Sequence, residues 1–254
     1  MQIRPGIELA NLSDVGCERS QNEDYYAYAE PECEGEFEKK GRLAIVADGM
    51  GGYEGGQIAS GLAVDYVRQT YFGFPFQDPQ QALLEAFRSA HEAIRDWVGE
   101  HPEFKGMGTT CTAAVLRDGE LYYGHVGDSR LYLLRENSIA SLTRDHTLVN
   151  RLLEQGLITP EEAAVHPDRN VLTAALGMDS HVPLDLSETP IPLRSADLLL
   201  LCTDGLYGLV NDNELLNIAG YYPPRDACHA LVEIAKHRGG PDNITLQIIR
   251  IDSL

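Results

Sequence analysis

The sequence is poor in cysteine and has no long apolar run. Its five cysteines are odd in number and include no pair at metal-ligand spacing, which favours a reducing compartment. They are Cys17, Cys33, Cys111, Cys202 and Cys228. No apolar run reaches the roughly 18 residues of a membrane span, and the N-terminal residues lack the apolar core of a signal peptide. We therefore expect a soluble cytoplasmic protein with no membrane partner.

Basic residues are scarce as well. Lysine and arginine total 20 against 39 aspartates and glutamates, which gives a formal net charge of −19. A chain this acidic is repelled by phosphate backbones, so we expect no nucleic-acid partner. An acidic surface in water accounts for most of this charge. It does not account for the aspartates that lie in apolar, glycine-rich stretches.

Length and composition indicate one domain. The 254 residues are 43% hydrophobic, enough for a sizeable buried core. No linker rich in serine or proline divides the chain, and no fixed-period repeat is present. We predict a single domain over residues 1–254, with a monomer as the default state.

The apolar pattern predicts a layered α+β sandwich. Strands are expected at residues 7–13, 25–29, 43–47, 109–117, 120–127, 129–134, 197–202 and 244–251. Helices are expected at residues 54–71, 79–100, 211–219 and 224–237, with shorter helical pieces within 145–178. Hairpin-like spacing of the strands favours antiparallel sheets over a doubly wound parallel sheet.

Local turn and capping signals add detail. Asp78 is expected to cap the helix that begins at Pro79, with Gln81 completing a capping box. Thr159 begins another capping signal. Residues 30–41, charged and punctuated by glycine and proline, indicate an exposed hairpin loop.

Four aspartates share one setting, at the end of an apolar strand beside a small residue. They are Asp48, Asp128, Asp204 and Asp242, and Glu23 and Asp24 precede another strand. Clustered carboxylates raise one another's pKa, and a divalent cation removes that cost. Oxygen ligands suit Mg²⁺ or Mn²⁺, whereas the His or Cys cluster that zinc prefers is missing. Because Asp-Gly is also a common turn signal, spacing alone leaves both a turn and a metal site open.

Eight ordered motifs carry a resemblance that runs from Gly16 to Thr245. They read GCERSQNEDYY, VADGMGG, MGTT, GHVGDSR, LTRDHT, HPDRNVLTAALG, LLLCTDGL and GGPDNIT. In this order and at these intervals they resemble the protein phosphatase type 2C family, the metal-dependent (PPM) phosphatases, in its short bacterial form. The resemblance implies a four-layer αββα sandwich with two face-to-face antiparallel sheets, flanked by helices. It also implies a flap subdomain at about residues 145–178.

The resemblance further implies hydrolysis of phosphoserine and phosphothreonine in proteins, in bacterial signalling. A hydroxide bridging two Mn²⁺ or Mg²⁺ ions would attack phosphorus directly, without a covalent enzyme intermediate. Asp48 resembles the bridging ligand, with the Gly49 carbonyl, Asp204 and Asp242 as further ligands. Matching the family's other positions, Glu23 and Asp24 act through waters, Asp128 serves a third ion, and Arg19 grips the substrate phosphate. From their chemistry, Ser129 and Asn243 are expected to orient these groups.

The sequence departs from the family at the proton donor. Met50 occupies a position where some members have histidine, and Tyr53 occupies another, so the general acid stays open. Gly208 stands where an acidic residue is common, which predicts a weaker accessory contact to the metals.

Three alternatives to this reading stay open. Phosphoryl transfer through an aspartyl-phosphate would need a DxDG pattern, which is missing at both Asp48 and Asp204. A non-catalytic binding module has only Gly208 in its favour. A nucleotide cradle at DGMGGYEGG lacks the Lys-Ser/Thr of a P-loop.

Overall fold

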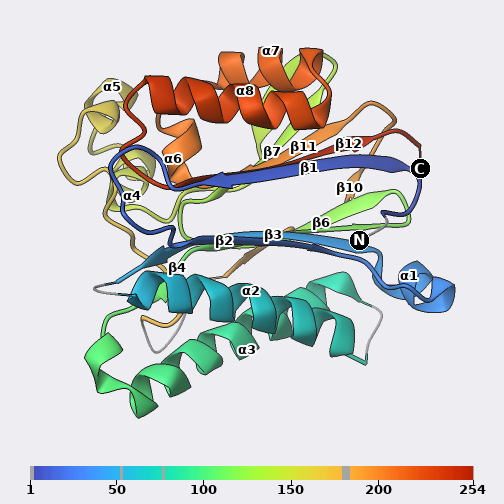
Figure 1. Cartoon of the computed structure of the whole chain (residues 1–254), viewed down its shortest axis with the longest axis horizontal. Coiled ribbons are helices and arrows are strands. Elements are labelled where there is room, and N and C mark those ends of the chain that lie inside the picture. The colour runs from blue at the N-terminus through green and yellow to red at the C-terminus, as the bar shows by residue number, and fades with distance from the viewer. Residues whose placement is uncertain (1–2, 52–53, 76–77, 179–183, 254) are drawn as a thin grey trace.

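The computed structural model describes residues 3–51, 54–75, 78–178 and 184–253. Two antiparallel sheets lie face to face in the middle of the molecule (Figure 1). The five-stranded sheet has the order β1-β12-β11-β7-β8. Its strands are β1 (Ile7–Asp14), β12 (Ile244–Ile251), β11 (Leu198–Cys202), β7 (Arg130–Arg135) and β8 (Ser138–Ser141).

The second sheet runs β10-β6-β5-β3-β2, with β4 added to β3 and β9 to β6. Its main strands are β2 (Asp24–Ala29), β3 (Arg42–Met50), β5 (Cys111–Arg117) and β6 (Glu120–Val126). Three two-residue strands complete it: β4 (Gly108–Thr109), β9 (Asp185–Leu186) and β10 (Ile191–Pro192). All pairings in both sheets are antiparallel, as predicted.

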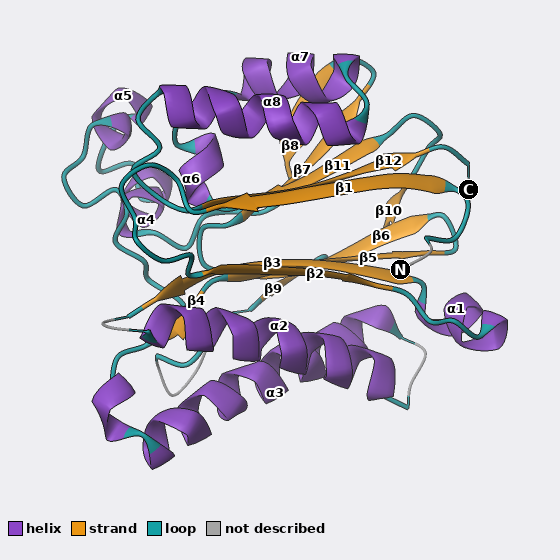
Figure 2. Cartoon of the chain, in the orientation of Figure 1, coloured by secondary structure: helices purple, strands orange, loops and turns teal. Residues whose placement is uncertain are grey.

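Helices cover the two outer faces (Figure 2). The second sheet carries α2 (Gly55–Gly73) and α3 (Pro79–Glu100), and the first carries α7 (Asp212–Tyr221) and α8 (Pro224–His237). Apolar side chains fill three layers: one under α2 and α3, one between the sheets, and one under α7 and α8. The four-layer αββα sandwich is therefore confirmed.

The remaining helices are short. Helix α1 (Glu34–Lys40) lies between β2 and β3 in the chain, and η1 (Pro102–Phe104) follows α3. Within the 145–178 segment lie α4 (Leu148–Glu154) and α5 (Pro160–Ala164), and α6 (Asp204–Tyr207) follows β11 directly. None of the helices among the residues described here is both long and apolar enough to cross a membrane.

Two local predictions were wrong. The 30–41 stretch is not a hairpin loop, because Glu34–Lys40 forms α1. Acidic residues in its first turn and lysines in its last turn favour a helix through the helix dipole, and Gly41 at φ 68° ends it. Asp78 caps α3 as predicted, but its side chain accepts from Gln80 N–H, and Gln81 completes no capping box. The capping box at Thr159 is present.

Candidate active site

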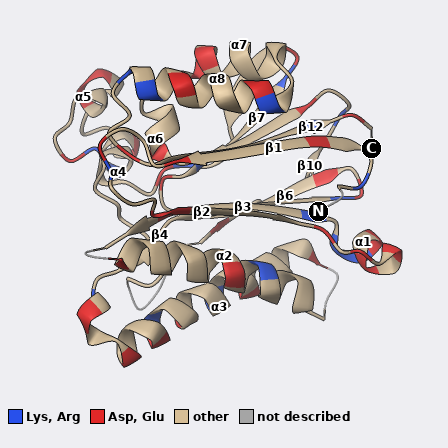
Figure 3. Cartoon of the chain, viewed as in Figure 1, with Lys and Arg blue, Asp and Glu red and all other residues tan. Residues whose placement is uncertain are grey.

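The predicted acidic residues come together at one end of the sandwich. Asp24 and Asp48 are direct cross-strand neighbours in the β2–β3 pair. Asp204 begins α6, Asp128 lies between β6 and β7, and Asp242 precedes β12. Figure 3 shows acidic residues at the strand ends nearest α4, α5 and α6. Strand order, not sequence proximity, therefore gathers these carboxyl groups.

Asp48 lies at the electrostatic centre of the group. Burial raises its pKa well above the usual range, and the charges of Asp24, Asp204, Asp128 and Asp242 raise it further. Like charges placed opposite each other in a sheet are destabilising, so this arrangement favours either bound protons or a compensating cation.

The neighbouring carboxyl groups share this condition. Burial raises the pKa of Asp24 to about 7, against the hydrogen bonds from Thr245 and Thr203, which lower it. The pKa of Asp128 is also raised, first by burial and then by the charge of Asp204. Burial and then Asp242 raise the pKa of Asp204, which lies close enough to hydrogen-bond with Asp48. Without a cation, this cluster retains protons that exposed aspartates release.

Two carboxyl oxygens in the cluster are buried without a hydrogen-bond partner, Asp24 Oδ1 and Asp204 Oδ1. Buried polar atoms are rarely left without a hydrogen-bond partner unless they bind an ion or a water molecule or take part in catalysis. An all-oxygen donor set with unpaired buried oxygens fits a hard divalent cation. Across the described stretches, however, no three His, Cys, Asp or Glu side chains already form a group that could hold a metal ion. The donor chemistry of the cluster nonetheless fits a hard divalent cation.

Arg19 brings a positive charge to the rim of the cluster. Its Nη2 donates to Asp242 Oδ2 at 2.9 Å, and its side chain is half exposed. The charges of Glu23 and Asp48 also act on it. An exposed guanidinium with donors beside a carboxylate cluster is suited to hold the oxygens of a phosphate.

Asn243 fixes the loop that carries Arg19 and Glu23. Its Nδ2 donates to the carbonyls of Val15 and Gln21 at 2.9 and 3.0 Å, and its Oδ1 accepts from Glu23 N–H at 2.8 Å. A single amide therefore holds both ends of the loop that contains Arg19.

Hydroxyl groups link the separate turns beneath the carboxylates. Asp48 N–H donates to Thr110 Oγ1 at 2.9 Å, and that oxygen lies 2.7 Å from Ser129 Oγ. Ser129 thus supports the Asp48 backbone through Thr110 and contacts no carboxylate of the cluster in this network. On the other side, Thr203 Oγ1 donates to Asp24 Oδ2 at 2.9 Å.

Gly49 is required by close packing. A Cβ there would lie 2.0 Å from the Gly56 carbonyl oxygen, and one at Gly56 would lie 2.6 Å from Glu23 Oε1. Only backbone without side chains brings β3, the start of α2 and Glu23 this close. Gly49 and Gly56 therefore allow the close approach of these three segments.

Histidine is a common proton donor in enzymes, and two histidines near the cluster have their ring nitrogens engaged by neighbouring groups. His125 is fully buried, with its ring nitrogens 2.8 Å from Thr112 Oγ1 and 3.0 Å from the Arg144 carbonyl oxygen. Burial lowers its pKa to about 4, so its ring is neutral at pH 7. His146 contacts Gly127 and Asp185. Tyr53, the other residue considered for this role, lies outside the described residues.

Sequence reasoning missed Thr203, Thr245 and Tyr207. Thr203 Oγ1 donates to Asp24 Oδ2 at 2.9 Å, Thr245 N–H donates to Thr203 Oγ1 at 3.1 Å, and the Tyr207 hydroxyl donates to the Asp128 carbonyl at 2.9 Å. All three sit inside or beside the quoted motifs. Their position in TDGLY and DNIT was the only available signal, and it did not reveal which way their side chains point.

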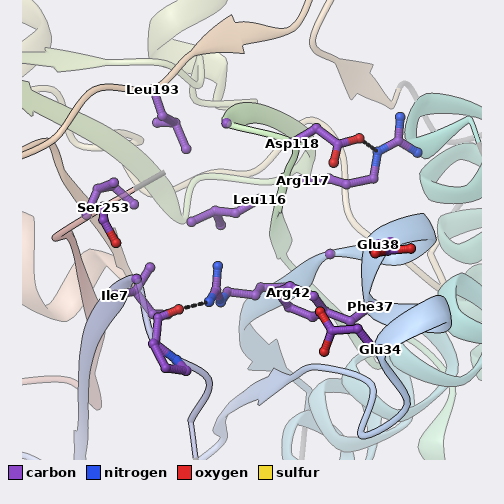
Figure 4. Close-up of a pocket in the computed structure, with 15 residues that line it drawn as sticks. Ile7, Glu34, Phe37, Glu38, Arg42, Leu116, Arg117, Asp118, Leu193 and Ser253 are labelled. Atoms are coloured by element: carbon purple, nitrogen blue, oxygen red, sulfur yellow. Dashed lines mark hydrogen bonds and ion pairs between the residues drawn. The ribbon is translucent and has the colours of Figure 1, made fainter.

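A separate cavity lies far from the clustered carboxylates. It holds about 450 Å³ at the opposite end of the sandwich, where α1 and both chain termini lie (Figures 1 and 4). Its lining includes Phe37, Arg42 and Leu116, and none of the clustered carboxylates. The candidate site is thus defined by its charge and not by the size of a hollow.

Comparison with known proteins agrees with this fold. Residues 20–236 match the family model of protein phosphatase 2C. Protein phosphatase PhpP of Streptococcus pneumoniae is 35% identical over 256 residues, covering 97% of this chain and 98% of the relative. The Mycobacterium tuberculosis serine/threonine phosphatase PstP/Ppp superposes with a TM-score of 0.85 at 35% identity, covering 97% of this chain and 99% of the other.

A second related structure contains bound manganese. The catalytic domain of PstP in complex with two manganese ions has a TM-score of 0.82 and 34% identity to this chain, covering 97% of it and 99% of the other. Family match, coverage and fold agree along nearly the whole sequence. The chain belongs to the protein phosphatase 2C family, and the two solved structures named here are of a bacterial serine/threonine phosphatase.

Proposed function

We propose that the acidic cluster is the active site of a manganese- or magnesium-dependent phosphatase acting on phosphoserine and phosphothreonine in proteins. The observation that carries this proposal is the buried group of mutually repelling carboxyls around Asp48. Asp48, the Gly49 carbonyl, Asp204 and Asp242 would hold two central ions, with Glu23 and Asp24 acting through water. Asp128 and Asp204 would hold a third, weaker ion.

Bound ions would supply charge neutralisation and a more acidic water for attack on phosphorus. The chain's own residues position the substrate. Arg19 sits half exposed beside Asp242 and can offer two donors to phosphoryl oxygens. Asn243 holds the Arg19 loop against Glu23, so the guanidinium and the carboxylates keep a fixed separation. No Asp is required to form a bond to phosphorus.

The rest of the chain supports this site. We propose one catalytic domain over residues 1–254, acting as a cytoplasmic monomer, with residues 145–178 as a flap. A backbone bridge between Thr109 of β4 and Leu176 ties this segment to the site, and a second bridge, between Thr147 and Leu172, closes the segment on itself. Its exposed apolar side chains Leu157, Val165 and Val171 give a surface that a phosphoprotein substrate can contact.

Hydrolysis of p-nitrophenyl phosphate and of a phosphothreonine peptide tests the proposal. Turnover of both should appear with Mn²⁺, fall with chelator and return when Mn²⁺ is added back. Absence of turnover at every manganese concentration would favour a binding module. A phosphorylated Asp48 trapped from the reaction would instead favour transfer through an aspartyl-phosphate.

A further inference from the structure

Tyr207 contacts the part of the site where Asp128 lies. Its hydroxyl donates to the Asp128 carbonyl oxygen at 2.9 Å, so the last residue of α6 holds the turn between β6 and β7. Asp204 begins the same four-residue helix. Any shift of α6 therefore moves both carboxylates assigned to the third ion.

Arg130 holds Tyr207 from the other side. Its guanidinium carbon lies 3.7 Å from the centroid of the Tyr207 ring, a close cation–π stack. Nε and Nη2 of Arg130 donate to Asp145 Oδ1 and Oδ2 at 2.9 and 2.7 Å. This two-point ion pair fixes the plane of the guanidinium on which the ring rests.

Asp145 begins the 145–178 segment. Its carbonyl accepts from Asn150 Nδ2 of α4 at 2.9 Å. The next residue, His146, bonds Gly127 twice: Gly127 N–H donates to Nδ1 at 3.2 Å, and His146 N–H donates to the Gly127 carbonyl at 2.7 Å. The turn at 127–128 is therefore held by the segment's base on one side and by α6 on the other.

We infer that Tyr207, Arg130 and Asp145 form a positioning clamp that couples the placement of the 145–178 segment to the carboxylates of Asp128 and Asp204. The clamp touches no substrate and acts only through the groups it holds. This inference rests on the proposed function, because the clamp affects turnover only if those carboxylates bind an ion.

A matched control exists on the same strand. Arg135, at the far end of β7, makes an equivalent two-point pair with Asp197, at 2.8 and 2.6 Å. Asp197 is more buried than Asp145, with 2% against 17% of its side chain exposed. Loss of the Arg135–Asp197 pair should thus cost at least as much stability, without reaching the 127–128 turn.

The test compares Tyr207→Phe and Asp145→Asn with Asp197→Asn. Tyr207→Phe keeps the ring and removes one hydroxyl. We expect the first two variants to weaken Mn²⁺ binding to metal-stripped protein by roughly tenfold, as loss of outer contacts to a metal site does. Free Mn²⁺ measured by electron paramagnetic resonance reports this without turnover. Amide hydrogen exchange of residues 145–150 should be faster in both variants. The Mn²⁺ affinity of the double variant should fall by no more than that of the more strongly affected single variant.

Asp197→Asn should lower Tm and leave Mn²⁺ affinity and turnover per folded molecule within twofold of wild type. The clamp is refuted if Tyr207→Phe and Asp145→Asn bind Mn²⁺ and turn over like wild type, or if Asp197→Asn matches their losses. Inactive wild-type protein that binds no Mn²⁺ would instead refute the proposed function, so the two failures are distinguishable.

Discussion

Acidic residues at the two ends of the sandwich differ in the partners that surround their carboxylates. At the end with the termini, Glu30 is nearly buried and accepts from Arg42 Nε, Arg4 N–H and the Tyr28 hydroxyl. At the other end, six carboxyl groups gather, and among the described ion pairs only Asp242 of these six has a partner, Arg19. At the first end, the carboxylate of Glu30 has hydrogen-bond and ion-pair partners within the chain. At the second end, most carboxyl groups have no ion-pair partner among the described residues.

The aromatic contacts repeat this contrast. Arg4 and Arg42 lie 4.6 and 5.0 Å from the Phe37 ring centroid, so both guanidinium groups are already engaged. Of the two, Arg42 also lines the far cavity, together with Phe37 (Figure 4). At the acidic end, Arg130 is also engaged, by Asp145 and Tyr207. Positive charge there is thus used to hold elements in place, which leaves Asp24, Asp48 and Asp204 without ion-pair partners among the described residues.

The largest effect should come from Asp48→Asn. This change keeps the shape and removes the charge that all neighbouring carboxyls surround. We expect kcat/KM for p-nitrophenyl phosphate to fall by roughly 10³-fold, the order seen when a central electrostatic group is lost. Asp118→Asn at the far end is the matched control and should keep full turnover. Substantial activity in Asp48→Asn would show that the cluster is not the active site.

The next largest effect should be on stability, at the opposite end. Glu30→Gln leaves Arg42 largely buried without its charge partner, with 13% of that side chain exposed. We expect the free energy of unfolding to drop by about 3 kcal/mol, which lowers Tm by roughly 6–12 °C. Turnover of the folded fraction should not change. Glu136→Gln removes the exposed pair with Arg194 and should cost under about 0.5 kcal/mol.

Arg19→Ala should have an intermediate effect on catalysis. Loss of a charged donor to the phosphate should lower kcat/KM about 10- to 100-fold, mostly through a higher KM. Arg19→Lys should recover part of this loss, because it restores charge without the two-donor geometry. Steady-state kinetics with a phosphopeptide separates the two parameters. A pure fall in kcat would mean that Arg19 acts on the chemical step and does not hold substrate.

The same contrast explains what the sequence could predict. Strand ends that carry aspartate are visible as apolar runs that stop at an acidic residue, so Asp48 and Asp204 could be found without the structure. The helix at 79–100 was equally visible, because Asp78, Pro79 and a periodic apolar stripe agree. In both cases the signal is local.

Features that depend on distant partners could not be predicted. Helix α1 has no buried residue, and its charged, glycine-punctuated sequence predicts a loop. Its Phe37 packs against Arg4 and Arg42, which are distant from each other in the sequence. Thr203 reaches Asp24 across 179 positions of sequence. Tyr207 contacts Asp128 only because α6 folds back over the β6–β7 turn. Tertiary packing decides these contacts.

The smallest expected effect concerns pH. Burial raises the pKa of Asp24 from 3.8 to about 7, so the folded, metal-free protein binds a proton more tightly than the unfolded chain. Its contribution to stability is fully present below pH 4 and is lost as pH rises toward 7.

Asp24→Asn removes this titration. Between pH 5 and 7.5 we expect the Tm of metal-free wild type to fall by a few degrees relative to Asp24→Asn, and saturating Mn²⁺ to abolish the difference. Scanning calorimetry at several pH values measures both, with Glu30→Gln as a control at the paired end. Parallel Tm curves for wild type and Asp24→Asn without metal would mean that ionised carboxylates at the acidic end destabilise the fold no more than those at the other end.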